Sequence, residues 1–267
     1  MNFENITNKV VELCIKNGNY IRKHQEKLEA KDIELKDEHN FVTYVDRTSE
    51  EMLVEELSKL TPGCGFIAEE DDYGNDDSEL KWVIDPLDGT TNFVHGVPVF
   101  AISVALMDGD EVASGVVHEV NRYESFYSWG NGKSYLNGRE IHVTRARTLK
   151  DSLLVTGFPY VRDHILEEYM NLFKEYIRRC QDLRRLGSAA TDLAYVAAGR
   201  FEGFYEISLN PWDVAAGTFL VSQAGGQITD FNGGDDFIFG RSLVASNKHI
   251  HNEMLKVAKE FYRINSF

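Results

Sequence analysis

The chain has 267 residues, of which 43% are hydrophobic and 27% charged, a composition typical of a globular protein with one domain or two lobes sharing a core. Its 28 basic and 43 acidic residues give a net charge of −15, which disfavours nucleic acid and anionic membranes as partners. No signal-like start or membrane-length apolar run is present, and the 3 cysteines form no CxxC pair, so we expect a cytoplasmic protein.

The first part of the chain predicts two helices followed by a sheet of hairpins. Apolar residues recur at helical spacing from Phe3 to Leu28. In "VTYVDRTSEEMLVEELSKL", Thr48 and Glu51 form a capping-box pattern, so Asp46 is expected where a strand meets a helix. The runs "GFIAEE" and "KWVIDP" are typical of short buried strands that end in acids. Two stretches that follow them predict hairpins, at 97–120 and 124–143.

The second part of the chain alternates strand, helix and strand, as α/β layering requires. Helices are expected over 163–180, 188–199, from Trp212 to the sequence "AGGQ", and over about 250–262. The change of rhythm predicts an N-terminal α+β lobe at 1–145 and a C-terminal α/β lobe at 146–267, packed as a single unit over 1–267.

The stretch "WVIDPLDGTTNF" places Asp85 and Asp88 three residues apart around a proline. Carboxylates are the ligands that Mg²⁺ prefers, and Gly89, Thr90 and Thr91 offer N–H groups and hydroxyls to a phosphate. An ordinary turn explains the same stretch equally well, because Asp, Pro and Gly are common turn residues. Spacing alone therefore leaves a turn and a phosphate site as alternatives.

Further acids stand at the ends of predicted elements and could share such a site: Asp46, Glu69, Glu70 and Asp213. The spacing of Asp85 and Asp88 does not match DxDxT, which favours metal-activated water over a phospho-aspartate. The acidic run "EEDDYGNDDSE" does not fit an EF-hand loop, and we interpret its later acids as a solvated loop.

Two long segments carry a resemblance to a known family. "WVIDPLDGTTNFVHGVPVFAISVAL" and "NPWDVAAGTFLVSQAGGQITD" resemble the two signatures of the inositol monophosphatase family, and "VTYVD" and "GFIAEE" precede them in the family's order. The resemblance spans about residues 5 to 262. It implies a five-layer αβαβα sandwich of the inositol monophosphatase/fructose-bisphosphatase type. It also implies a Mg²⁺-dependent, lithium-sensitive phosphatase that forms a homodimer.

The resemblance implies two or three Mg²⁺ ions per site. Carried over position by position, Glu69, Asp85 and the backbone carbonyl of Leu87 hold the first ion. Asp85, Asp88 and Asp213 hold the second. Glu69 also helps to hold a weaker third ion, and we count it among the catalytic residues.

The resemblance further assigns the attacking water and the substrate. Thr90, with Asp46 behind it, orients and deprotonates the water. The N–H groups of Gly89 and Thr90 hold phosphate oxygens. Substrate hydroxyls meet Ala189 and Glu206, together with the two ligands of the second ion, Asp88 and Asp213.

Three functions remain open at this stage. The first is hydrolysis of inositol monophosphate or a similar small ester, and the second is action on fructose 1,6-bisphosphate, NADP or a 3′-phosphoadenosine nucleotide. Five arginines could contact a second phosphate, although such residues more often lie at a surface or interface: Arg162, Arg178, Arg179, Arg184 and Arg185. The third function is that of a non-catalytic, metal-binding regulatory protein.

Overall fold

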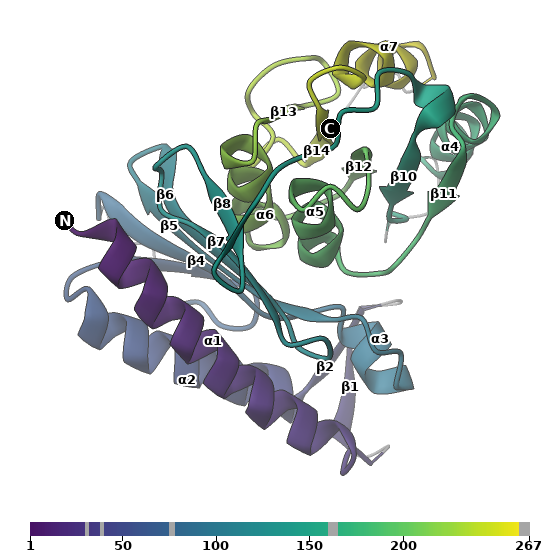
Figure 1. Cartoon of the computed structure of the whole chain (residues 1–267). Coiled ribbons are helices and arrows are strands. Elements are labelled where there is room, and N and C mark those ends of the chain that lie inside the picture. The colour runs from purple at the N-terminus through teal and green to yellow at the C-terminus, as the bar shows by residue number, and fades with distance from the viewer. Residues whose placement is uncertain (30–31, 38–39, 75–77, 160–164, 262–267) are drawn as a thin grey trace.

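Helices and sheets alternate in five layers (Figure 1). The structure is a computed structural model that describes residues 1–29, 32–37, 40–74, 78–159 and 165–261. The layers are two helices, a seven-stranded sheet, two helices, a five-stranded sheet and two helices. This arrangement confirms the predicted αβαβα sandwich. The division into lobes at residue 145 stays a prediction. Within the described residues, no helix has the length and apolar character of a membrane span.

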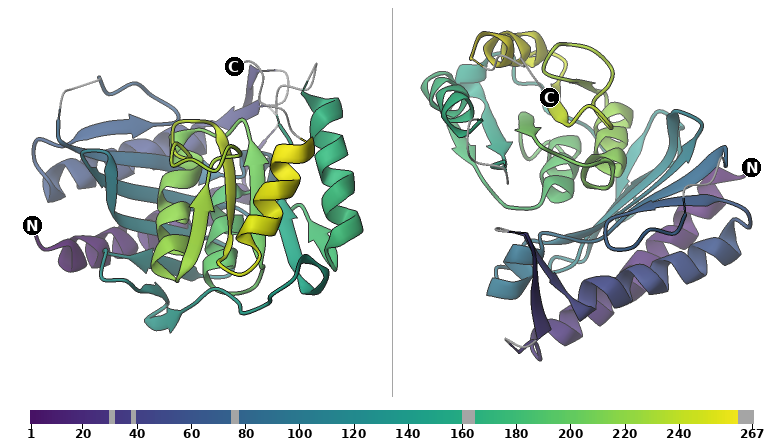
Figure 2. Two further views of the ribbon diagram at one scale, coloured as in Figure 1. Left: turned by 90° about the horizontal axis from the view of Figure 1, so that it is seen from above. Right: turned by 180° about the vertical axis from the view of Figure 1, so that it is seen from behind.

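The first layer consists of α1 (Phe3–Gln25) and α2 (Tyr44–Leu60), which lie side by side on one face of the seven-stranded sheet (Figure 2, right). The predicted apolar stripe of α1 is buried at Ile6, Val10 and Ile21. A hairpin of β1 (Ile33–Asp37) and β2 (Asn40–Thr43) joins the two helices.

The N-terminus of α2 corrects the predicted capping box. The N-cap is Thr43, whose hydroxyl accepts the N–H of Val45, while Asp46 accepts the N–H of Thr43. Thr48 and Glu51 therefore lie inside the helix, and their assignment as the box was wrong. The sequence T-x-x-D at Thr43 satisfies the same capping rule one turn earlier.

The seven-stranded sheet has its strands in chain order, and β3 and β4 are parallel while each later neighbouring pair is antiparallel. Its strands are β3 (Gly65–Ala68), β4 (Leu80–Asp88), β5 (Ala101–Asp108), β6 (Glu111–Glu119), β7 (Glu124–Ser128), β8 (Ser134–Leu136) and β9 (Arg139–Ile141). The two predicted hairpin regions are confirmed. Between β4 and β5 lies the short helix α3 (Thr90–His95), which the sequence analysis did not predict.

The middle layer holds α5 (Ala189–Ala197) and α6 (Pro211–Gln223), which contact both sheets. All nine residues of α5 are buried, because the helix has a sheet on each side. A Cβ at Gly217 would lie 2.6 Å from the Cβ of Leu193, so glycine permits the close approach of these two helices.

The five-stranded sheet and its outer helices complete the molecule. Its strands run in the order β11-β10-β12-β14-β13. They are β10 (Leu153–Thr156), β11 (Asp182–Arg184), β12 (Gly203–Ile207), β13 (Gly226–Thr229) and β14 (Ser242–Asn247). The 3-10 turn η2 (Leu149–Asp151) precedes it, and α4 (Leu166–Arg179) and α7 (His251–Phe261) cover its outer face. The four helices predicted in this half are present, although residues 163, 164 and 262 of two of those predictions lie outside the described residues.

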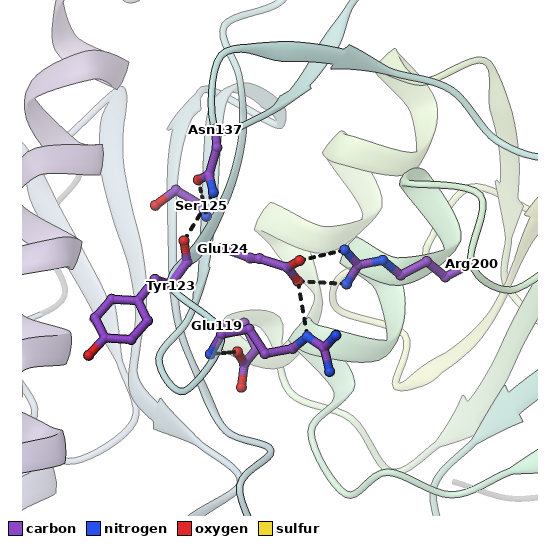
Figure 3. A network of polar contacts seen from close by, with 7 residues as sticks. Glu119, Tyr123, Glu124, Ser125, Asn137 and Arg200 are labelled. Carbon is purple, nitrogen blue, oxygen red and sulfur yellow. Dashed lines mark hydrogen bonds and ion pairs between the residues drawn. The ribbon is translucent and has the colours of Figure 1, made fainter.

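An ion pair joins the middle layer to the seven-stranded sheet (Figure 3). Arg200, just after α5, donates from both terminal nitrogens to Glu124 on β7, at 2.6 Å each. The guanidinium also lies 4.3 Å from the ring centroid of Tyr195. A bidentate pair of this kind fixes direction as well as distance, so it orients α5 against the sheet.

Candidate active site

Three carboxylates from two elements converge at one end of the molecule's middle layer. Asp85 and Asp88 belong to the end of β4, and Asp213 lies in the first turn of α6. One carboxylate oxygen from each of the three lies within 4.8 Å of the others. The two interpretations of "DPLDGT", as a turn and as a functional site, are therefore compatible, because the turn brings the acids together.

A bulge in β4 explains how acids three residues apart share one face. Side chains of a regular strand alternate, so residues i and i+3 point to opposite faces. Asp85 pairs with Ser103 and Asp88 pairs with Ala101, so three steps on β4 oppose two steps on β5. The additional residue restores both carboxylates to the same side.

Backbone and hydroxyl donors orient each carboxylate. Asp85 accepts the N–H of Leu87 at 2.9 Å. Asp213 accepts the N–H of Asn210 at 2.7 Å as part of the capping box of α6. Asp88 is held from α5, where the Ser188 hydroxyl and the Ala190 N–H donate to it at 2.6 and 2.7 Å.

The electrostatics of the cluster favour a bound cation. Burial, with repulsion from Glu69 and the two neighbouring aspartates, raises the pKa of Asp85 well above its ordinary range. Burial raises the pKa of Asp88 to about 6, and burial together with the charge of Asp88 raises that of Asp213 to about 7. A divalent cation relieves this repulsion, and an all-oxygen set of carboxylates suits Mg²⁺.

Glu69 lies beside the cluster at the end of β3, since its charge contributes to the raised pKa of Asp85. The chain that follows it is held by the buried Glu50 of α2. Glu50 accepts the N–H groups of Glu70 and Asp71 at 2.9 and 2.8 Å, one on each carboxylate oxygen. The position of Glu69 therefore depends on a contact with α2.

Thr90 and Asp46 form the pair that the resemblance implied. The Thr90 hydroxyl lies 3.0 Å from Oδ1 of Asp46 and 3.1 Å from the carbonyl oxygen of Leu87. Asp46 is buried, and burial raises its pKa, while hydrogen bonds from Thr43 and Thr90 act in the opposite direction. A carboxylate with a raised pKa is a suitable proton acceptor.

The turn between β4 and α3 presents backbone N–H groups. Gly89 is the N-cap of α3 with φ of +96°, in the left-handed region that glycine adopts without strain. A Cβ there would lie 3.1 Å from the carbonyl oxygen of Val99. The N–H groups of Thr90 and Thr91 begin the helix and have no partner within it.

A cavity of about 40 Å³ adjoins two of the three aspartates, Asp88 and Asp213. Its lining includes the predicted substrate contacts Ala189 and Glu206, and also Ser188, Asp192 and Arg185. Sequence reasoning missed Ser188 and Asp192. The signal for Asp192 was a lone acid in the otherwise apolar run "AATDLAYVA", and Ser188 stands at an N-cap position.

The arginines named as possible phosphate contacts separate into different groups. Arg178 and Arg179 pair with Glu175 on α4, and Arg184 pairs with Asp182. Arg185 lines the cavity, whereas Arg162 lies outside the described residues.

Comparison with known proteins decides the family. The model of the inositol monophosphatase family matches residues 2–263. The chain belongs to this family. Membership supports a phosphatase that acts on a small phosphorylated substrate, and the acidic cluster could hold the metal on which the family depends.

Individual relatives bear two kinds of name. The inositol-1-monophosphatase of Mesorhizobium japonicum is 38% identical over 260 residues, which cover 96% of each chain. The Nus factor SuhB of Escherichia coli K12 is 40% identical over 249 residues, covering 93% of each. Among solved structures, the suhB protein of Bartonella henselae has a TM-score of 0.90 at 35% identity, covering 96% of this chain and 98% of that one. The Thermotoga maritima IMPase has a TM-score of 0.87 at 35% identity, covering 95% and 96%.

Proposed function

We propose that this protein is a Mg²⁺-dependent phosphomonoesterase that hydrolyses inositol monophosphate or a similar small phosphate ester. The observation that carries the proposal is the convergence of Asp85, Asp88 and Asp213 beside the Thr90–Asp46 pair. A phosphate dianion repels hydroxide. Cations held at such a site reduce this repulsion, and a positioned base removes a proton from the attacking water.

The metal ligands in this proposal are those implied by the family. Glu69, Asp85 and the carbonyl of Leu87 would hold one Mg²⁺. Asp85, Asp88 and Asp213 would hold another, and Glu69 would help with a third. When bound, Mg²⁺ would neutralise phosphate charge and lower the pKa of coordinated water.

The chain's own residues position the water and the ester. Thr90 Oγ1 takes a proton from the attacking water as its own proton passes to Asp46, which lies 3.0 Å away. The N–H groups of Gly89 and Thr90, with Thr91 beside them, hold the phosphate oxygens. Ala189 and Glu206 contact hydroxyls of the alcohol that leaves.

A substitution of Asp88 tests the metal assignment. Asp88→Asn removes one charge from the second ion's ligands, so we expect Mg²⁺-dependent phosphate release from myo-inositol 1-phosphate to fall at least about 100-fold. Thermal denaturation should show that the variant is folded but less stabilised by Mg²⁺ than the wild type. Asp108→Asn, at the exposed end of β5, is the matched control and should behave as wild type. Near wild-type activity of Asp88→Asn would refute the assignment.

The substrate is tested separately with a panel of esters. Myo-inositol 1-phosphate is compared with fructose 1,6-bisphosphate, NADP and 3′-phosphoadenosine 5′-phosphate, each with and without Mg²⁺ and Li⁺. Preference for a bisphosphate or nucleotide would favour the second alternative, for which Arg185 in the cavity is the available cation. The Nus factor name belongs to the relatives that bear it. For this chain, release from none of the four esters would favour a non-catalytic regulatory protein.

Four further properties stay predictions: inhibition by lithium, a homodimer, a cytoplasmic location, and no nucleic-acid or membrane partner. Inhibition by lithium is measured in the panel of esters with and without Li⁺. The homodimer is tested by measuring the mass of the protein in solution.

A further inference from the structure

Asp192 is a buried acid for which the mechanism above has no use. It lies in α5, has 1% of its surface exposed, and neither carboxylate oxygen has a hydrogen-bond partner among the described residues. A buried carboxyl group without a hydrogen-bond partner is unfavourable, because burial removes its contacts with water and nothing replaces them. Such a group is therefore a candidate to form a hydrogen bond with a bound ligand.

Asp192 lines the small cavity next to the aspartate cluster. Asp88, Glu206 and Asp213 line the same cavity, and its volume of about 40 Å³ is close to the volume of one water molecule or one hydroxyl group. Burial, together with the negative charges of Glu206 and Asp88, raises the pKa of Asp192 well above the ordinary range.

The chemistry of the cavity favours a hydroxyl over a cation as the occupant. Within the described residues, the acids whose ligand atoms converge for a metal are Asp85, Asp88 and Asp213, and this group does not include Asp192. Arg185 lines the cavity and already provides a positive charge. What Asp192 lacks is a donor, and the hydroxyl of an alcohol is a donor that fits the space.

Asp192 does not hold the metal ligands in place. Ser188 and Ala190 make the contacts from α5 to Asp88, and the Ser188 hydroxyl also contacts Thr191. None of these bonds uses the Asp192 side chain, so its removal should leave the phosphate end of the site intact.

We propose that Asp192 is a specificity-determining residue whose carboxylate accepts a hydrogen bond from a hydroxyl of the alcohol half of the substrate. This inference rests on the proposed phosphatase function. It adds to the site a contact that selects polyol phosphates over phosphate esters with no further hydroxyl. Glu206 lines the same cavity and contacts the same alcohol, so the two acids together select its pattern of hydroxyl groups.

The test compares two esters in the Mg²⁺-loaded protein. For myo-inositol 1-phosphate, Asp192→Ala should lower kcat/KM about 10- to 100-fold, the effect of losing a hydrogen bond to a charged group. For phenyl phosphate, which has no further hydroxyl, the change should be below about 3-fold. Asp192→Asn keeps an acceptor oxygen and should recover most of the loss. Melting temperature should change little in either variant, because the Asp192 side chain has no hydrogen bond to lose among the described residues.

Glu119→Gln is the matched control. Glu119 is also 1% exposed with one unpartnered oxygen, but it ends β6 outside the cavity, so its substitution should not change the ratio of the two kcat/KM values. Equal losses of Asp192→Ala on both esters would show a structural role and overturn the inference, as would no loss on either. If the wild type hydrolyses neither ester, the proposed function fails and the inference falls with it.

Discussion

The hydroxyl of Thr90 has one proton and two nearby acceptors, Asp46 and the Leu87 carbonyl. Either arrangement leaves lone pairs on Oγ1 that can accept a hydrogen bond from water. The residue therefore bridges the proposed base and the proposed attacking water. Because this role is exercised as the water is activated, it should affect the chemical step more than the binding of substrate.

Substitution of Thr90 tests that role. Thr90→Ala should lower kcat about 100-fold or more, the usual contribution of a positioned acid or base, and change KM by less than about 3-fold. Thr90→Ser keeps the hydroxyl and should recover most of kcat. Steady-state kinetics with myo-inositol 1-phosphate provide the measurement. A rise in KM alone would move Thr90 from water activation to substrate binding.

At the scale of elements, the site depends on how α2 is attached to the chain after β3. Glu50 is fully buried and uses both carboxylate oxygens on the N–H groups of Glu70 and Asp71. Tyr73 also donates a hydrogen bond to it. This connection places Glu69 beside the aspartate cluster, although α2 contributes none of the three clustered carboxylates.

Glu50→Gln should therefore weaken the contact that positions Glu69, while the Glu69 side chain itself stays in the protein. A glutamine has one acceptor oxygen for two N–H groups, so one of them loses its partner. We expect the Mg²⁺ concentration for half-maximal activity to rise about 10-fold, with kcat at saturating Mg²⁺ close to wild type. Glu51→Gln, on the exposed side of the same helix, controls for loss of charge. Superimposable Mg²⁺ titrations of wild type and Glu50→Gln would contradict the role of Glu50.

The elements also show what the sequence could and could not predict. β4, α6 and the acids at their ends followed from apolar runs and two long family signatures. The bulge that turns Asp85 and Asp88 to one face was not predicted, because a bulge depends on the register with β5. The contact of Ser188 with Asp88 joins residues 100 positions apart, and local patterns carry no information on such a pair.

At the scale of the whole molecule, the layered arrangement explains why the spacing of apolar residues did not indicate which face of each middle-layer helix is buried. α5 and α6 are buried between two sheets, so neither has the polar face that marks a surface helix. The order of layers came from the family resemblance and not from the pattern of apolar residues. Asp192 was missed for a related reason, since an acid in an apolar helix gives no sign of what it faces.

The buried acids make the stability of the whole protein depend on pH and metal together. In the metal-free protein, the folded state binds more protons than the unfolded chain from about pH 4 to 7, because the pKa of Asp88 is about 6 and that of Asp213 about 7. The free energy of unfolding then falls as pH rises through these values. His118 and His251, each with a pKa lowered to about 4 by burial, act in the opposite direction below pH 7.

We therefore expect Mg²⁺ to raise the melting temperature more at pH 8 than at pH 5. At pH 8 the aspartates are ionised and repel one another until a cation binds, whereas at pH 5 protons already neutralise part of the cluster. Thermal denaturation at both pH values, with EDTA or with Mg²⁺, provides the measurement. Asp213→Asn leaves both histidines unchanged, so the difference in pH dependence between wild type and variant reports the contribution of Asp213 to the aspartate cluster. In EDTA the variant should lose less stability than wild type between pH 5 and pH 8. Equal losses would mean that the aspartate cluster does not control this part of the stability.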